Sequence, residues 1–217
     1  MSRFVYLHGF ASGPSSQKAR FFRERFAELG MGLEIPDLAE GRFEQLTISG
    51  QLAVIERVAD GEPVSLIGSS MGGYLAALYA ARHPQVEKLV LLAPAFSFLT
   101  RWPEELGEEK MDQWKRSEVL QVFHYSEGRE AALGYQLIED ARKFEHYPEF
   151  LQPTLIFHGK HDTTVPAGNS ITFSKRHPDT TLRLMESDHQ LLNVLDDIWI
   201  DTERFLFGQV AGNSTRL

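Results

Sequence analysis

The sequence predicts an α/β fold in which a mostly parallel sheet of about six strands is flanked by helices. Short apolar segments typical of buried strands alternate with longer segments whose apolar residues recur at helical spacing. Because a helix-length segment separates most consecutive strands, the strands should run parallel and end at one edge of the sheet, where a functional site is expected. The candidate strands are 3–7, 32–35, 64–67, 88–93, 154–157 and 180–185.

The segments between these strands predict helices. In the first, Phe22, Phe26 and Leu29 recur on one side and arginines occupy the rest of the surface, while Gly30 ends the helix. The last helical segment is expected to be the closing helix of the fold. The candidate helices are 17–29, 44–59, 74–81, 167–176 and 190–207.

The alternation breaks between Ala95 and Tyr147, where no apolar strand is expected. This stretch is longer than an ordinary connection and carries aromatic residues among charged, helix-favouring ones. We predict a small helical lid at about 96–148, with a single crossover helix and long loops as the alternative. The whole chain, 1–217, should form a single domain, and the polar segment 208–217 a flexible tail.

Composition excludes several classes of function. The chain has no cysteine, which excludes disulfides, thiolate metal sites and a cysteine nucleophile. Its formal net charge of -8 disfavours nucleic acid and anionic membranes as partners. The longest apolar run, Leu89–Phe96, is too short to span a bilayer, and the first residues do not resemble a signal peptide. We therefore expect a cytoplasmic protein that binds neither nucleic acid nor membrane.

The sequence Gly68-Ser69-Ser70-Met71-Gly72 joins a candidate strand to a candidate helix. By itself a G-x-S-x-G pattern should occur by chance in on the order of one chain in ten of this length. Between a strand and a helix, however, it resembles the nucleophile elbow of the α/β-hydrolases, a tight turn that needs small residues on both sides of an exposed serine. The resemblance implies that Ser70 is a nucleophile.

A serine nucleophile needs a base, and in the α/β-hydrolases the base is a histidine that follows the last core strand. Of the eight histidines, only His189 lies there. His158 and His161 remain alternatives, because both follow an earlier strand. We expect His8 to be structural, and His83 and His177 to lie at the surface.

The base needs an orienting acid, which in this superfamily follows the next-to-last core strand. Asp162 lies at that position. Asp188 is a rival because it adjoins His189, but adjacent loop residues rarely point at each other, and we expect it to cap the closing helix. Asp37 is a third candidate, with a turn or a cap as its expected role.

The same superfamily stabilises the developing oxyanion with two backbone N–H groups. The resemblance assigns one to Met71, directly after the nucleophile. The other is assigned to Phe10, because His8-Gly9-Phe10 is similar to the H-G-x loop of these enzymes. Phe10, Met71 and Phe96 are also expected to line the substrate pocket.

Three segments resemble the YqiA-like small bacterial esterases: 6–18, 68–73 and 187–189. The resemblance covers residues 3 to about 207 and implies a carboxylesterase that acts on small, partly apolar esters through an acyl-enzyme on Ser70, without metal or cofactor. Thioesterase, perhydrolase, C–C hydrolase and amidase chemistry remain alternatives, since they use similar machinery. Two further alternatives are a non-catalytic binding protein of the same fold and a lipase that acts at a membrane interface. A monomer or a small homo-oligomer is expected.

Overall fold

The computed structural model describes residues 3–208, so nearly all of the expected tail at 208–217 lies outside the described residues. Its main sheet has the order β1-β2-β3-β6-β7, and all four pairs of neighbouring strands are parallel. The predicted parallel α/β architecture is therefore confirmed. The strands of this sheet are β1 (Arg3–Leu7), β2 (Val64–Ser69), β3 (Val86–Leu92), β6 (Thr154–Gly159) and β7 (Thr180–Met185).

The main sheet has five strands, because the segment expected at 32–35 forms only an isolated parallel bridge between Glu34 and Val5. Two hydrogen bonds hold it: the Tyr6 amide donates to the Glu34 carbonyl at 2.8 Å, and the Glu34 amide donates to the Phe4 carbonyl at 2.9 Å. The next donor along this segment would be residue 36, which is a proline without an N–H group. The ladder therefore stops after one bridge.

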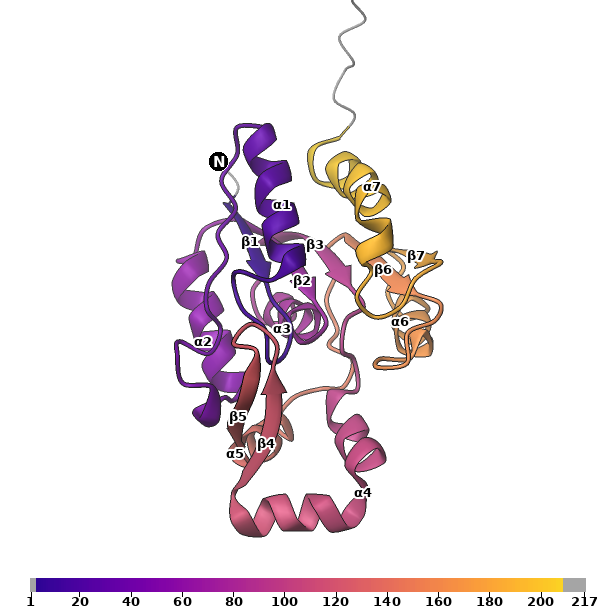
Figure 1. Ribbon diagram of the computed structural model, residues 1–217. Helices are drawn as coiled ribbons and strands as arrows, with labels where there is room; N and C mark the ends of the chain where they lie inside the picture. Colours follow the sequence, from indigo (N-terminus) through magenta and orange to yellow (C-terminus); the bar gives the residue numbers. More distant parts are fainter. Residues whose placement is uncertain (1–2, 209–217) are drawn as a thin grey trace, which may run out of the picture.

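Helices cover both faces of the sheet, as Figure 1 shows. Alternate residues of β1 serve the two faces, because side chains alternate along a strand. Phe4 and Tyr6 join the core under α1 and α7, whereas Val5 and Leu7 join the core under α2, α3 and α6. These helices are α1 (Gln17–Glu28), α2 (Ile48–Ala59), α3 (Met71–Ala80), α6 (Ala167–Ser174) and α7 (Leu195–Phe207).

Two of these helices start later than their sequence patterns predict. The helix expected from residue 44 begins with a separate 3₁₀ turn, Phe43–Gln45, and α2 follows an N-cap at Thr47, whose side chain accepts a hydrogen bond from the Gly50 amide. The closing helix is likewise preceded by a 3₁₀ turn at Leu192–Val194. No helix within residues 3–208 combines the length and apolar character needed to cross a membrane.

Residues 96–148, called the insertion below, form the lower part of the molecule in Figure 1. They contain α4 (Phe98–Ser117), the antiparallel hairpin of β4 (Val119–His124) and β5 (Arg129–Gly134), and α5 (Gln136–Ala141). The expectation of a purely helical insertion is therefore wrong. Charged and polar residues interrupt both strands, so they show no apolar run, and the turn between them is marked only by Gly128 at a φ of 65°.

The insertion is bound to the sheet and its loops at several points. The Tyr125 amide, beside the hairpin turn, donates to the Ala11 carbonyl in the loop after β1 at 2.8 Å. The Tyr74 hydroxyl of α3 donates to the Glu145 carbonyl at 2.8 Å. Trp114 is buried inside the insertion, where its indole N–H donates to the Leu133 carbonyl and so joins α4 to the hairpin.

His177 was expected at the surface, and this prediction is wrong. The imidazole is 4% exposed and stacks on Phe173, with the ring centroids 3.8 Å apart. Its two nitrogens lie within hydrogen-bond distance of the Phe173 and Pro148 carbonyl oxygens. A neutral ring donates to one of these carbonyls, and this hydrogen bond together with the stacking on Phe173 accompanies its burial.

The tightest backbone contact of the fold is between the start of α3 and the end of β1. A Cβ atom on Gly72 would lie 2.1 Å from the Leu7 carbonyl oxygen, and one on Gly68 would lie 2.4 Å from the Gly72 carbonyl oxygen. Only glycine fits at either position, because backbone atoms rather than movable side chains occupy the space. The strand, turn and helix therefore pack at a distance that side chains would prevent.

We expect Gly72→Ala to lower the free energy of unfolding by at least about 3 kcal/mol, because the helix must move away from β1. Urea unfolding measures this loss. The matched control is Gly168→Ala in α6, where an added Cβ meets nothing within 4 Å. That change should leave stability the same or raise it by up to about 1 kcal/mol. Equal stability of the two variants would contradict the contact described.

Candidate active site

Ser70 lies in the sharp turn between β2 and α3, at the carboxyl edge of the sheet. Its backbone has φ 54° and ψ -115°, a strained conformation for a residue with a side chain. Backbone hydrogen bonds hold this conformation: the Ser70 amide donates to the Leu92 carbonyl, and the Ser70 carbonyl accepts from the Gly73 and Ala95 amides. The turn therefore has the strand–turn–helix context and the strained serine that the sequence predicts.

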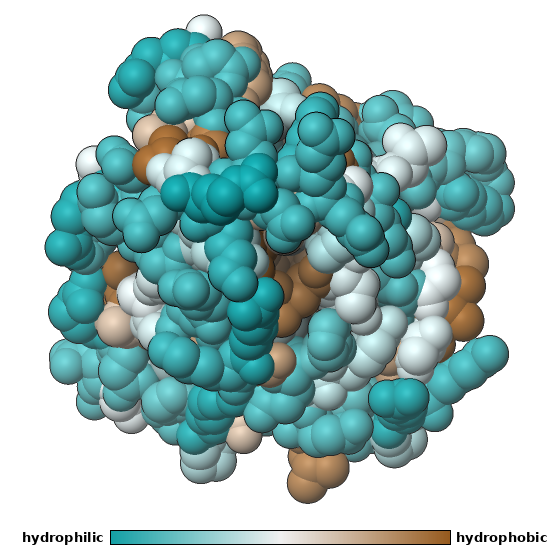
Figure 2. All heavy atoms as spheres, turned by 90° about the horizontal axis from the view of Figure 1, so that it is seen from below, coloured by the Kyte–Doolittle hydropathy of each residue, from teal (hydrophilic) through white to brown (hydrophobic). Residues whose placement is uncertain are grey.

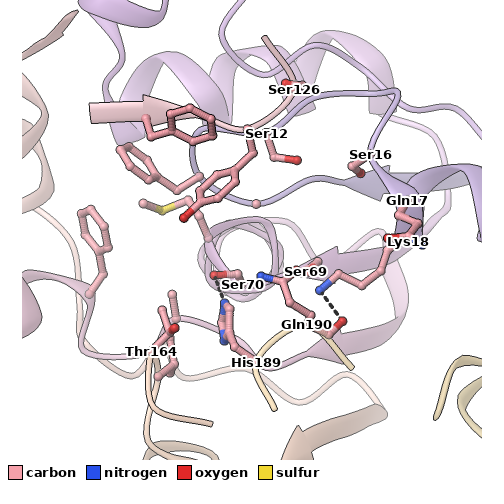
Figure 3. Close-up of a pocket in the computed structure, with 18 of the residues that line it drawn as sticks. Ser12, Ser16, Gln17, Lys18, Ser69, Ser70, Ser126, Thr164, His189 and Gln190 are labelled. Carbon is pink, nitrogen blue, oxygen red and sulfur yellow. Dashed lines mark hydrogen bonds between the residues drawn. The ribbon is translucent and has the colours of Figure 1, made fainter. Parts of the chain in front are cut away.

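The structure brings Ser70, His189 and Asp162 together from three separate loops, which follow β2, β7 and β6. His189 Nε2 lies 3.1 Å from Ser70 Oγ, and His189 Nδ1 lies 2.7 Å from Asp162 Oδ2. The first of these contacts is drawn as a dashed line in Figure 3. The imidazole is thus within hydrogen-bond reach of both a hydroxyl and a carboxylate, which is the arrangement that allows it to accept a proton from the hydroxyl.

Asp162 is fully buried and is the most heavily hydrogen-bonded carboxylate of the site. Its Oδ1 accepts from the Thr164 and Val165 amides, and its Oδ2 lies close to both His189 and His158. Burial by itself raises the pKa of Asp162, but the hydrogen bonds from His158, His189 and the Val165 amide outweigh burial and hold the pKa well below its ordinary value. The group therefore stays a carboxylate at any pH where the protein is expected to act.

His158, one of the alternative bases, lies next to the same Asp162 oxygen as His189. It is wholly buried, with Nε2 3.1 Å from Asp162 Oδ2 and 2.8 Å from the Val165 carbonyl oxygen. Its Nδ1 lies 2.7 Å from Ser170 Oγ. A neutral ring satisfies all three partners when Nε2–H donates and Nδ1 accepts from the serine. His158 therefore supports the carboxylate and has no contact with Ser70.

The other candidate residues have contacts away from the Ser70 hydroxyl, mainly within their own loops. His161 is exposed and contacts Glu186 rather than the site. Asp188 accepts the Gln190 amide in a local turn, without contact to the His189 ring, and it does not cap α7, which starts at Leu195. Asp37 accepts the Ala39 and Gly41 amides and so shapes a turn. His8 is buried, and its Nε2 accepts the Leu38 amide.

Two backbone N–H groups next to Ser70 are free to bind a substrate oxygen. Among residues 3–208 no acceptor receives a hydrogen bond from the amides of Phe10 or Met71. The Met71 amide begins α3, whose dipole favours negative charge. The loop that carries Phe10 passes beside Ser70, because a Cβ on Gly9 would lie 3.4 Å from Ser70 Cβ. Both amides lie without an acceptor in segments next to Ser70, and their role in binding an oxyanion stays a prediction.

Ser70 and His189 line a cavity of about 910 Å³. Figure 2 shows the molecule from the side of the insertion, where hydrophobic atoms are visible in a hollow of a mostly hydrophilic surface. The three predicted pocket residues, Phe10, Met71 and Phe96, all line the cavity. The apolar wall is largely aromatic, and the insertion contributes four rings besides Phe96: Phe98, Trp102, Phe123 and Tyr125.

The opposite wall is polar, and the sequence analysis assigned no role to its residues. It is formed by the start of α1 and by the loop that carries His189, and it includes Lys18 and Gln190. Lys18 is 9% exposed, and its ammonium group donates to the Gln190 carbonyl at 3.0 Å. Burial lowers the pKa of Lys18 from 10.5 to about 8, although the charges of Asp162 and Asp188 act in the opposite direction. Nothing in the local sequence marks this lysine, because its place in the cavity depends on its contact with Gln190, far along the chain.

Within the described part of the chain, no group of three or more His, Cys, Asp or Glu side chains is arranged to hold a metal ion. The sequence pattern of an uncharacterised protein family (UPF0227) matches residues 3–203. The chain belongs to this family. The match covers all the site residues described above and confirms the resemblance to the YqiA-like proteins. No curated protein is significantly similar in sequence.

Solved structures share the fold over nearly the whole chain. Est1E from Butyrivibrio proteoclasticus with bound ferulic acid is 23% identical over 97% of this chain and 90% of its own, with a TM-score of 0.80. Alpha/beta hydrolase domain-containing protein 10 from mouse is 23% identical over 92% and 89%, with a TM-score of 0.73. A Paleococcus ferrophilus monoacylglycerol lipase is 17% identical over 93% and 92%, with a TM-score of 0.66. The fold is therefore that of the α/β-hydrolases and is akin to esterases and lipases.

The buried charge of Lys18 predicts a pH-dependent stability. Below pH 8 the group is charged in both the folded and the unfolded chain, and the full penalty of burying the charge is present. Between pH 8 and 10.5 the folded protein releases the proton first, so its stability should rise relative to Lys18→Met. The total change is on the order of 3 kcal/mol, measured by urea unfolding of both proteins across this range.

Arg23→Met serves as the control, because Arg23 is an exposed cation on the same helix whose guanidinium donates to the Pro14 carbonyl. Its effect on stability should be small and constant between pH 8 and 10.5. A stability difference between wild type and Lys18→Met that stays flat over the same range would contradict a buried lysine charge.

Proposed function

We propose that the protein is a serine hydrolase that cleaves small, partly apolar carboxylic esters through an acyl-enzyme on Ser70. The observation that carries this proposal is the hydrogen-bonded series Ser70–His189–Asp162 on the wall of a cavity large enough for a small-molecule substrate. The structural similarity to an esterase and a lipase supports hydrolase chemistry in general, and the arrangement of the site residues is the basis for the specific mechanism proposed.

In the proposed mechanism, Ser70 Oγ attacks the ester carbonyl while His189 Nε2 takes the hydroxyl proton. The Asp162 carboxylate accepts the Nδ1–H of His189 throughout, which fixes the tautomer and stabilises the imidazolium that forms. The Phe10 and Met71 amides bind the oxyanion, and each contributes on the order of 3 kcal/mol in the transition state. His189 then gives the proton to the leaving alcohol.

The second half of the cycle uses the same groups. A water molecule attacks the acyl-enzyme carbonyl while His189 takes its proton, and the acid leaves as Ser70 regains the proton. The aromatic wall of the cavity suits the apolar part of the ester. Thioesters are the second candidate substrates, since their cleavage uses the same nucleophile, base and oxyanion donors.

The first test is Ser70→Ala on p-nitrophenyl esters and acyl thioesters of graded chain length. We expect kcat to fall by at least about 10⁴-fold, because the acyl-enzyme cannot form. A fluorophosphonate probe, which labels activated serines covalently, should label the wild type and leave the variant unlabelled. Turnover by Ser70→Ala equal to that of the wild type would rule out the serine mechanism, and a wild type inert to both substrates and probe would favour a binding protein.

The second test compares Asp162, which contacts the His189 ring, with Asp188, which adjoins His189 only in sequence. Asp162→Asn should lower kcat by about 10⁴-fold, because the amide cannot stabilise the correct imidazole tautomer or the imidazolium. Asp188→Asn makes the same chemical change next to His189 in sequence and should stay within a few-fold of the wild type. Steady-state kinetics on the best ester decides between them, and the reverse ranking would assign the orienting role to Asp188.

A further inference from the structure

The cavity that contains Ser70 also contains a buried cation. Lys18 lines the cavity with nine-tenths of its surface covered, and its side chain comes from the first turn of α1. Its hydrogen-bond acceptor is neutral, the Gln190 carbonyl. No carboxylate among residues 3–208 forms an ion pair with it. The charges of Asp162 and Asp188 favour the ammonium group from a distance, but burying it without a direct ion pair is still costly, so its presence in a ligand cavity calls for an explanation.

The position of Lys18 relative to the nucleophile is visible in Figure 3. Ser70 and His189 lie near the middle of the cavity, the aromatic rings lie on one side of them, and Lys18 and Gln190 lie on the other. The ammonium group points toward Gln190, the residue directly after His189. A substrate whose ester carbonyl reaches Ser70 therefore extends toward aromatic rings in one direction and toward a cation in the other.

The backbone around Lys18 has the same preference for negative charge. The first turn of α1 contains no acidic residue, and the N-cap Ser16 makes no side-chain cap. In the described chain, the amides of Gln17 and Lys18 have no acceptor. Free N–H groups at a helix N-terminus carry a partial positive charge and bind anions. The helix end and the ammonium group thus favour the same kind of ligand.

A purely structural role for Lys18, in which it only holds the Gln190 carbonyl, explains less of this arrangement than ligand binding does. Holding the Gln190 carbonyl needs one N–H donor, whereas an ammonium group supplies three and adds a charge. A neutral donor such as the nearby Gln17 side chain would avoid burying a cation. The remaining donors of Lys18 lie at the wall of the cavity, where a ligand can reach them.

We propose that Lys18 binds a carboxylate of the substrate, so that the preferred esters are anionic at one end and apolar at the other. This inference rests on the proposed function of Ser70 and adds a substrate class to it. The carboxylate accepts hydrogen bonds from the Lys18 ammonium group, the apolar group packs on the aromatic wall, and the ester carbonyl lies between them at Ser70. The carboxylate can belong to the acid or to the alcohol part of the ester.

Two pairs of esters test the proposal, each differing in one charged group. The p-nitrophenyl monoester of glutaric acid is compared with p-nitrophenyl pentanoate, which places the charge on the acid side. Then 4-carboxyphenyl butyrate is compared with 4-methylphenyl butyrate, which places it on the alcohol side. The measured quantity is the ratio of kcat/KM for the anionic ester to that for the neutral ester, so that any common loss of activity cancels.

We expect this ratio to fall by about 10- to 100-fold in Lys18→Met for at least one pair, since hydrogen bonds to charged groups are stronger than neutral ones. The pair that responds identifies which side of the ester faces Lys18. In the control Arg23→Met, which removes an exposed cation from the same helix, the ratio should remain that of the wild type. An unchanged ratio in Lys18→Met for both pairs would overturn the proposal.

Binding to Ser70→Ala separates this proposal from the proposed function, because it needs no turnover. Isothermal titration calorimetry with both pairs should give a lower Kd for the anionic member than for the neutral member of at least one pair, and Lys18→Met in the same background should remove the difference. If wild type cleaves no ester but this difference is found, the anion site stands and the hydrolase proposal fails. If esters are cleaved but the two members bind equally, the hydrolase proposal stands and the anion site fails.

Discussion

The close approach of α3 to β1 is the constraint on which the rest of the site depends. With hydrogen in place of a side chain at Gly68 and Gly72, strand, turn and helix pack backbone against backbone. This contact brings the loop after β1 beside Ser70, so one compact turn places both a nucleophile and two free amides. Several backbone hydrogen bonds hold Ser70 in its strained conformation. They join it to Leu92 of β3, to Ala95 beyond that strand and to Gly73 in α3.

Electrostatics at the site is arranged around Asp162. The carboxylate receives hydrogen bonds from two backbone amides and lies between two imidazoles, His158 and His189. The two rings have different environments: His158 is enclosed and satisfied by Val165 and Ser170, whereas His189 borders the cavity. The enclosed ring keeps the carboxylate in place, and the bordering ring is left with one nitrogen directed at Ser70. Two histidines of equal chemistry are thus distinguished by their surroundings alone.

Much of this arrangement was predictable from the order of residues along the chain. A parallel sheet collects its strand ends at one edge, so Ser70, Asp162 and His189 could be expected to meet, and they do. The hairpin at 119–134 was not predicted from apolar runs, because Gln121 divides the apolar residues of β4 and only three apolar residues follow each other in β5. The burial of His177 and the position of Lys18 in the cavity depend on contacts with distant segments. The local sequence does not predict these contacts. The chemical roles of the site residues stay predictions.

The hydrogen bond from the Tyr125 amide to the Ala11 carbonyl ties the hairpin of the insertion to the loop after β1. Ala11 directly follows Phe10, and Tyr125 directly follows β4, whose hairpin contributes rings to the cavity wall. Any movement of the hairpin away from the cavity must either break this bond or pull the loop that carries the Phe10 amide. Under the proposed function, in which the Phe10 amide binds the oxyanion, this bond would tie the position of the hairpin to the alignment of that donor.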